Sequence, residues 1–389
     1  MTPANVLTLS ILTIPEREAY LKRLLQSIST LELDPLPRVD VIYNRPLNGS
    51  LGDVEAQIRA HAPNMPIDIY CNAGETSIVG GRNLQLSVCR TPLIAFVDDD
   101  ITLHGDIVPA ILETLAEHPV GMIGFPSFKE DTNVRIKPRD STPSVEWHKL
   151  RYSPVQGMLC AGYRALFADV GGFNPRRRYW GEWTEMNLRL WRSGFPTAYQ
   201  MERGFLRHWQ DAPSSPTRNM EGREQHVVWG LICTALEYDA VDVNEATAVF
   251  WRLVEERYLA YSYGTELTPR NVLKTVLELV PNISAQWGSI QAFRAQTAQH
   301  PFKFAPFHRF TRDEVKGVIA HARDAISQYR SQVRREVARS SGGSNEVVIQ
   351  KQETLRNAVH RLSASVRRLR ARFQSRSSAR PGTRARSVT

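Results

Sequence analysis

The sequence of 389 residues has little cysteine and lacks any long hydrophobic run. Its four cysteines, at positions 71, 89, 160 and 233, are widely spaced and form no Cys-x-x-Cys pair, which excludes the usual zinc-site and disulfide patterns. No run approaches the roughly 18 to 20 apolar residues of a membrane-spanning helix. The apolar segment 6–12 follows no Lys or Arg and precedes no small-residue cleavage site, unlike a secretion signal. These absences predict a cytoplasmic protein in a reducing compartment.

The net charge of +9 is concentrated at one end of the chain. Residues 331–389 contain 14 Lys and Arg against three acidic residues, so the remainder has a net charge of −2. From position 361 onward there are nine Arg and no acidic residue, a composition that predicts a disordered end. The tail is either a solubilising segment or a binding segment for an anionic partner such as nucleic acid, a membrane surface or a glycan. The protein would then lie peripherally on a membrane or nucleic acid.

Two apolar stripes at helical spacing precede that end. The first runs from Val315 to Val333, and the second lies in a predicted amphipathic helix over about 346–373, within an Arg-rich tail that spans 339–389. We expect this pair of helices to dock on the body of the protein or on a second copy of the chain, as in a homo-oligomer.

The first two hundred residues alternate between strand and helix patterns. Strands are predicted at 6–12, 39–43, 67–71, 93–97 and 120–125, with helices at 16–29, 80–89 and 107–117. This alternation predicts an α/β fold, a mostly parallel sheet with helices on both faces. From about residue 235 the pattern is helical. We therefore expect a catalytic domain over 1–230, a helical region over 231–338 and the tail beyond it.

Three consecutive aspartates, Asp98, Asp99 and Asp100, end the strand predicted at 93–97. Adjacent carboxylates at the end of a buried strand repel one another unless a cation lies close by. Oxygen ligands suit Mg²⁺ or Mn²⁺, either of which binds a diphosphate. The alternative is a solvated acidic turn that merely ends the strand.

Other polar residues are expected at the same edge of the sheet, because ligands of such sheets bind at the carboxyl ends of the strands. Thr13, Pro15 and Arg17 follow the first predicted strand, and Asn44 follows the second. Gly80-Gly81-Arg82-Asn83 opens a helix, where amides and a guanidinium can meet a pyrophosphate. We predict nucleotide contacts from these residues; a proline-initiated helical turn and a Gly-rich surface turn are the structural alternatives.

A segment rich in Trp and Glu supplies the next candidates. Glu182, Glu185 and Arg189 share one face of a predicted helix, and Trp180 and Trp183 flank its start. A carboxylate in that first turn can act as a base, with the tryptophans as a platform for a sugar ring. The alternative is a capping carboxylate and a Glu185–Arg189 ion pair. His208 follows a short predicted strand further along the chain.

Over roughly residues 5–210, the order of these motifs resembles the family 2 glycosyltransferases with the Rossmann-like GT-A fold. The motifs are, in chain order, Thr-x-Pro-x-Arg, Gly-Gly-Arg-Asn, Phe-Val-Asp-Asp-Asp, Gly-Gly-Phe, Glu-x-x-Glu-x-x-x-Arg and a later His. The resemblance implies transfer of a sugar from a nucleotide-diphosphate sugar, by family default a UDP-sugar, to an acceptor hydroxyl. It also implies roles for the residues that match. Asp98 and Asp100 of the DXD motif would bind Mn²⁺ or Mg²⁺ with His208. Asp99 would touch ribose or sugar, and Arg82 the diphosphate.

One position departs from that pattern. The family commonly has Glu-Asp where this chain has Glu182-Trp183, and that Asp is the usual base of inverting members. We therefore expect Glu182, or as second choice Glu185, to take the proton, or else a retaining enzyme without such a base. The segment 180–194 also resembles the polypeptide N-acetylgalactosaminyltransferases, which are retaining, so the stereochemistry stays open.

Two other classes of protein remain open at this stage. A nucleotidyltransferase would also use carboxylates and a metal, but its Gly-rich loop would follow the first strand, and residues 12–17 contain no Gly. A nucleic-acid-binding protein would act through the basic tail. The near-neutral charge of the rest of the chain argues against nucleic-acid binding as the main role. The acceptor of a glycosyltransferase could be a glycan, a protein side chain or a modified nucleobase.

Overall fold

The computed structural model describes residues 3–47, 49–130, 132–138, 144–177, 181–209, 220–240, 242–255, 269–306 and 308–340. The described residues up to Arg334 form one compact unit, and the last turns of the final helix lie outside it. The amphipathic helix over 346–373, the disordered end and Trp180 lie outside the described residues. The proposals that rest on them stay predictions.

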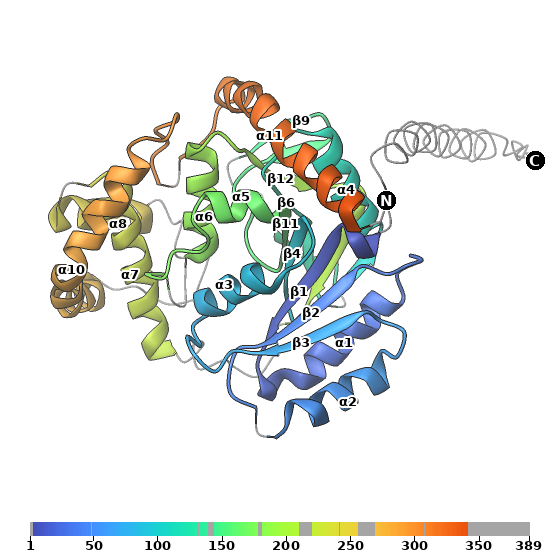
Figure 1. The fold of residues 1–389 in the computed structure, drawn as a ribbon. Coiled ribbons are helices and arrows are strands. Elements are labelled where there is room, and N and C mark those ends of the chain that lie inside the picture. Colours follow the sequence, from blue (N-terminus) through green and yellow to red (C-terminus); the bar gives the residue numbers. More distant parts are fainter. Residues whose placement is uncertain are drawn as a thin grey trace, which may run out of the picture. The chain divides into compact units, whose positions relative to one another are not determined.

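A large mixed sheet forms the centre of the described structure (Figure 1). Its strands lie in the order β3 (Ile67–Cys71), β2 (Arg38–Tyr43), β1 (Leu7–Thr13), β4 (Leu93–Asp98), β11 (Leu159–Tyr163), β6 (Met122–Gly124), β12 (Thr197–Gln200), β10 (Leu150–Tyr152) and β9 (Val145–Trp147). The four strands from β3 to β4 are parallel. Beyond β4 antiparallel pairs enter, with β6 and β12 parallel to each other. The α/β fold class predicted from the sequence is confirmed.

Helices cover both faces of the parallel half. The helices of this part are α1 (Glu18–Ser29), α2 (Leu51–His61), α3 (Ile78–Val88), α4 (Ile107–Glu117), α5 (Arg164–Asp169) and α6 (Glu182–Arg192), with short 3₁₀ turns η1 (Pro3–Asn5) and η2 (Pro15–Arg17). Figure 1 shows α3 on one side of β1 and β2, with α1 and α2 on the other. Because both faces are covered, residues of either parity are buried along β1, including the polar Thr8 and Ser10 between its apolar residues.

A second, four-stranded sheet was not predicted from the sequence. It has the order β5 (Ile101–Gly105), β13 (Gly204–His208), β7 (Ser127–Lys129) and β8 (Arg135–Lys137). Two of these strands have only three residues, too few for an alternating pattern to be recognised in the sequence. This sheet is important for the site, because β5 follows Asp100 directly and pairs its Ile101 with His208 of β13.

The C-terminal helices are α7 (Met220–Tyr238), α8 (Val243–Glu255), α10 (Pro269–Thr297) and α11 (Arg312–Ser340). The first three share an apolar core that includes Val228, Ile232 and Ile283. The stripe predicted from 315 to 333 is buried, and Arg330 of α11 donates hydrogen bonds to the backbone oxygens of Leu115 and His118. This helix therefore docks on the body of the same chain. Helix α7 passes through residue 230, and the domain limits given above stay a prediction.

Two of the predicted absences can be compared with the described residues. All four cysteines are free, with Cys71 exposed and the other three buried. None of the helices within the described ranges combines the length and the apolar character that a bilayer crossing requires.

The buried carboxylate of Asp40 in β2 gives a pH-dependent prediction. Asp40 is fully buried, and its burial raises the pKa of its carboxyl to about 6, although Arg38 opposes this shift. In the unfolded chain an aspartate has a pKa of about 3.9. Between these values the folded protein holds more protons than the unfolded one, so the free energy of unfolding falls as the pH rises from about 4 to 6 and stays lower above that.

We expect Asp40→Asn, which cannot ionise, to be more stable than the wild type at pH 7 by about 1–3 kcal/mol. The two proteins should converge near pH 4. Urea unfolding at pH 4, 5, 6 and 7 measures this difference, with Asp324→Asn on the exposed face of α11 as control. A difference that does not change with pH would contradict the assignment.

Candidate functional site

The acidic triplet lies at the carboxyl ends of the parallel strands, where the sequence placed it. Asp98 is the last residue of β4 and is in register with Leu12 of the adjacent β1. The side chains of Asp99 and Asp100 are 2% and 5% exposed, whereas that of Asp98 is 33% exposed. Of the three carboxylates, Asp98 is thus the one that faces solvent.

The segment after β1 holds the two buried aspartates. The Thr13 hydroxyl donates a hydrogen bond of 2.7 Å to Asp99 Oδ2. The Arg17 guanidinium lies 3.0 Å from Asp99 Oδ1 and 2.6 Å from Asp100 Oδ2. Arg17 ends the 3₁₀ turn η2, which Pro15 begins. The structure therefore brings Thr13 and Arg17 to the triplet, while Pro15 shapes the turn that delivers Arg17.

His208 reaches the triplet from the small sheet. Its Nε2 lies 3.5 Å from Asp100 Oδ2, and the amide of Trp209 donates to the Asp100 backbone oxygen at 2.8 Å. The Nδ1 atom of His208 is buried without a hydrogen-bond partner among the described residues. The pairing of β5 with β13 thus juxtaposes an imidazole and a carboxylate that are more than one hundred positions apart in the sequence.

Asp98 is held from two directions. The Arg82 guanidinium of α3 forms an ion pair with its Oδ1 atom, and the amide of Met158 donates to its Oδ2 atom at 3.0 Å. Arg82 is only 3% exposed and also donates to Gln85. The sequence assigned Arg82 to a diphosphate; in the structure its guanidinium is buried against Asp98.

The charges divide the buried aspartates into two kinds. Burial raises the pKa of Asp99 to about 7, although Arg17 opposes this shift. Burial would also raise the pKa of Asp100, but the hydrogen bond and charge of His208, together with Arg17, outweigh it and hold this pKa below its usual range. Asp100 is consequently the carboxylate that stays ionised over the whole neutral range.

Glu182 is the candidate base that the structure places near the triplet. It begins α6 after Gly181, whose φ of 82° is in the left-handed region that favours glycine. Burial raises the pKa of the Glu182 carboxyl above its usual value, with Arg82 lowering it and Asp98 raising it. The charges of Arg82 and Asp98 both act on this carboxyl, and Glu182 stays the candidate base predicted from the sequence.

Trp183 lies beneath this site. Its side chain is 6% exposed and packs edge-on against Phe96 and Phe173, at ring-centre distances of 5.6 and 5.0 Å. The Arg82 guanidinium lies 5.5 Å from the centre of its ring. The sequence predicted a sugar platform, but an indole buried in this way supports Arg82 from behind instead.

Glu185, the second choice for the base, has a different environment. It is fully buried, one carboxylate oxygen accepts from Arg189 at 2.7 Å, and the other accepts from the Tyr238 hydroxyl at 2.5 Å. The Glu185–Arg189 ion pair was the structural alternative in the sequence. Because both oxygens are already engaged within the protein, we retain Glu182 alone as candidate base.

The two asparagines predicted to contact a nucleotide serve the backbone instead. Asn44 donates to the backbone oxygens of residues 76 and 77 and accepts from Asn72, which fixes the loop before α3. Asn83 both donates to and accepts from the backbone of Phe173. A polar residue beside a Gly-rich turn fits either role, and here both side-chain amides hold the framework of the site.

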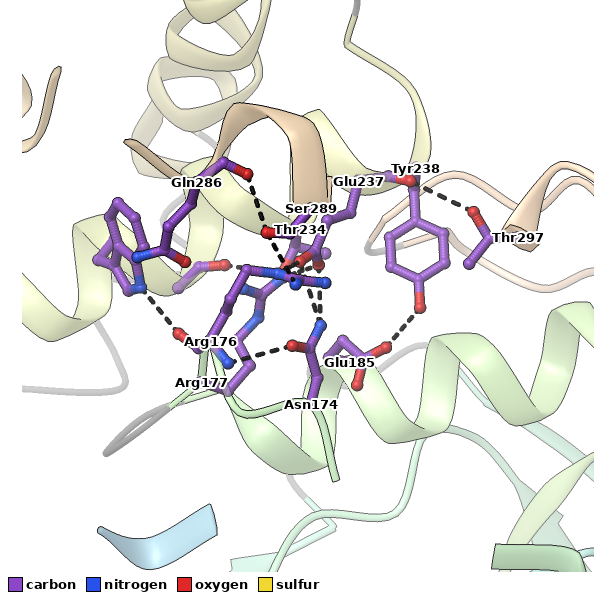
Figure 2. Close-up of polar contacts among 12 residues, drawn as sticks. Asn174, Arg176, Arg177, Glu185, Thr234, Glu237, Tyr238, Gln286, Ser289 and Thr297 are labelled. Carbon is purple, nitrogen blue, oxygen red and sulfur yellow. Dashed lines mark hydrogen bonds and ion pairs between the residues drawn. The ribbon is translucent and has the colours of Figure 1, made fainter. Parts of the chain in front are cut away.

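A buried ion-pair network connects the loop before α6 to the C-terminal helices (Figure 2). Glu237 of α7 is fully buried and accepts from Asn174 at 3.1 and 3.2 Å and from Arg176 and Arg177. The indole of Trp229 donates to the Arg176 backbone oxygen at 2.7 Å. The sequence analysis missed Glu237, because nothing near it in the sequence identifies a partner about sixty positions away.

No metal cluster is formed by the residues that the structure describes, in the sense of three His, Cys, Asp or Glu side chains able to hold one ion. Asp100 and His208 supply the oxygen and imidazole donors that Mn²⁺ and Mg²⁺ accept, and they lie next to each other. Asp100 also pairs with Arg17, and Asp98 is engaged by Arg82 and Met158. The donor set therefore fits a divalent ion in its chemistry, with Asp100 and His208 as the pair already assembled.

Removal of Glu237 tests how much the buried network stabilises the fold. Glu237→Ala would leave two buried guanidiniums without their carboxylate, and we expect a loss of about 3–5 kcal/mol in the free energy of unfolding. Glu245→Ala, an exposed carboxylate on α8, should change it by less than about 0.5 kcal/mol. Denaturant unfolding followed by circular dichroism measures both. Equal effects of the two variants would refute a structural role for the network.

Comparison with known proteins gives similarity to solved structures alone, since no protein-family model and no curated protein matches the chain. The solved structures are glycosyltransferases, the class that the sequence motifs resemble. GalNAc-T7 with UDP, GalNAc and Mn²⁺ is 14% identical with a TM-score of 0.44, over 66% of this chain, which spans 58% of that protein's chain. The mannosyltransferase PcManGT from Pyrobaculum calidifontis, with GDP-Man and Mn²⁺, is 14% identical with a TM-score of 0.45, over 77% of this chain and 86% of its own. S. aureus TarS is 12% identical with a TM-score of 0.47, and the similarity covers 75% of this chain and 53% of the TarS chain.

Proposed function

We propose that this protein is a glycosyltransferase of the GT-A type, which moves a sugar from a nucleotide-diphosphate sugar to an acceptor hydroxyl. The observation that carries this proposal is the convergence of the acidic triplet, Arg17 and His208 at the carboxyl ends of the parallel strands. Ligands of α/β sheets bind at this edge. The motifs that resemble family 2 glycosyltransferases supply the same residues, and the solved structures named above point to the same class.

The cations of the site match the charge that the reaction develops. A departing nucleoside diphosphate gains negative charge, and preorganised positive groups stabilise it best when they do not have to move. The Arg17 guanidinium is fixed by Asp99 and Asp100 and is 13% exposed, so it borders the site. Arg82 is buried and acts through Asp98, which it orients. We assign Arg17 to the leaving group and Arg82 to the positioning of Asp98.

A divalent ion is part of the proposal through the chemistry of its donors. Asp100 and His208 would hold Mn²⁺ or Mg²⁺, with Asp98 joining from the exposed side of the triplet. When bound, the ion would offset the charge of the diphosphate. Asp99 does not have this role, because its carboxylate is held by Thr13 and Arg17 and its pKa is raised to about 7.

Glu182 is the group we assign to the acceptor proton. A general base works best when its pKa approaches the working pH, and burial shifts the pKa of Glu182 in that direction. Its place in the first turn of α6 also lets the amides at the helix start stabilise the carboxylate form. This assignment applies to an inverting enzyme. A retaining enzyme would need no such base.

The reaction is tested by nucleotide release. We expect the wild type, with Mn²⁺ or Mg²⁺, to release a nucleoside diphosphate from at least one nucleotide sugar in a panel that begins with UDP-sugars. Asp100→Asn should reduce release by about 100-fold or more, because the ionised carboxylate beside His208 is lost. The control Asp106→Asn alters an exposed aspartate a few residues further on. The proposal fails if the wild type neither binds nor cleaves any member of the panel.

The role of Glu182 is tested separately from donor binding. Glu182→Gln keeps the shape of the side chain but cannot accept a proton, so transfer to the acceptor should slow by about 10²–10⁴-fold. The dissociation constant of the donor, measured by calorimetry, should stay within about twofold of the wild type. Glu202→Gln, an exposed residue before β13, is the control. Unchanged transfer in Glu182→Gln would favour a route without this base.

A further inference from the structure

A pocket lies at the end of α6 that is opposite to Glu182. Its volume is about 420 Å³, within the range of small-molecule sites. It is lined by the segment 169–176 after α5, by the end of α6 with Ser193 and Phe195, by the end of α10 with Phe293, and by Tyr329 of α11. None of the residues assigned above to the reaction lines it.

The length of α6 separates this pocket from Glu182. Glu182 begins the helix and Ser193 follows its last residue, so the two lie about 16 Å apart along the axis at the usual rise of 1.5 Å per residue. The pocket is therefore a separate site that shares one rigid element with the proposed reaction centre. A ligand that contacts both must be extended, such as a chain of several units.

The two arginines of the pocket wall have their counter-charges within the protein, and Asp169 adds a carboxylate to the wall. Arg176 is paired with Glu237, and Arg189 with Glu185, two carboxylates that are fully buried. Burial, reinforced by Arg192, Arg189 and Lys303, lowers the pKa of His300 to about 4, so its imidazole is neutral at pH 7. Since both guanidiniums already have their counter-charges, the wall does not favour a phosphate or a carboxylate as ligand.

The remaining wall combines aromatic rings with uncharged hydrogen-bonding groups. Phe293 is partly exposed, with the guanidiniums of Arg176 and Arg189 at 5.0 and 5.7 Å from its ring centre. The side chains of Ser193 and Gln296 have no hydrogen-bond partner among the described residues, although both line the pocket. A hydroxyl and a carboxamide together offer donors and acceptors to a neutral polar ligand.

Two rings on the other side of the pocket are fixed in place. The Tyr329 hydroxyl donates to Asp169 Oδ2 at 2.8 Å, and its ring packs edge-on against Phe195 at 5.8 Å between centres. Tyr329 also lies 5.8 Å from the ring of Tyr163. Aromatic rings with few rotatable bonds give contact area at low entropic cost. The pocket is thus largely preformed.

We propose that this pocket binds one sugar ring of a neutral glycan. A pyranose has an apolar C–H face that can lie on Phe293 and a rim of hydroxyls for Gln296, Ser193 and Asp169, the groups that line the pocket.

The proposal is tested by direct binding, independently of catalysis. The full-length protein is titrated with methyl glycosides of glucose, galactose, mannose and N-acetylglucosamine, using saturation-transfer NMR, and with inorganic phosphate, using isothermal titration calorimetry. We expect at least one glycoside to bind. Gln296→Ala should weaken that binding about fivefold through loss of hydrogen bonds, and Phe293→Leu about tenfold through loss of the ring. Gln299→Ala, at an exposed position just beyond α10, should leave it unchanged.

Each outcome decides for or against the pocket. Absence of binding for all glycosides, binding of phosphate alone, or binding that is unaffected by both Gln296→Ala and Phe293→Leu would overturn the proposal. Because Phe293→Leu removes the ring but keeps an apolar side chain, an unchanged melting temperature separates loss of the ligand contact from loss of the fold. Nucleotide release by the same variants should equal that of the wild type. A protein that binds a glycoside here but cleaves no nucleotide sugar would refute the proposed reaction and leave the pocket standing.

Discussion

Pairing of buried carboxylates with guanidiniums is the constraint on which this structure depends. Asp98, Asp99 and Asp100 follow one another at the end of a strand, and each pairs with a guanidinium from another element: Asp98 with Arg82 of α3, and Asp99 and Asp100 with Arg17 of η2. A buried carboxylate without such a partner would be expensive to desolvate. The triplet therefore fixes how the first turn after β1, helix α3 and the small sheet are arranged around it.

Buried carboxylates are also paired with guanidiniums between α6, the loop before it and α7. Glu237 and Glu185 are fully buried and hold Arg176, Arg177 and Arg189. Through these pairs the C-terminal helices hold the segment 174–177 that leads toward Glu182. One cluster of charges thus organises the proposed reaction, and the other keeps its frame in place. Glu185, Glu237 and Arg177 of this second cluster are fully buried, which indicates a structural role.

Much of the fold could be predicted from the sequence, because its strongest signals are local. The face of α1 with Leu21, Leu24, Leu25 and Ile28 is buried as its spacing predicted, and the first parallel strands agree with their apolar runs. The three-residue strands of the second sheet gave no such signal. In the site, Thr13, Arg17 and the triplet come together, since residues after parallel strands meet at one edge, whereas His208 reaches them through the second sheet. Residue spacing alone did not show that Asn44 and Asn83 form hydrogen bonds with backbone groups, or that Trp183 is buried. It also did not show that Glu237 forms ion pairs with the loop before α6. These contacts join segments that are distant in the sequence.

The arginines beside the triplet have a consequence for how the protein depends on its surroundings. Proteins whose folding relies on a bound metal unfold when chelators remove it. Here the counter-charges of all three carboxylates belong to the chain itself, at fixed positions in the fold. The charge balance of the triplet accordingly needs no ion, and on the proposed function a cell short of divalent metal would hold an intact, idle protein rather than an unfolded one.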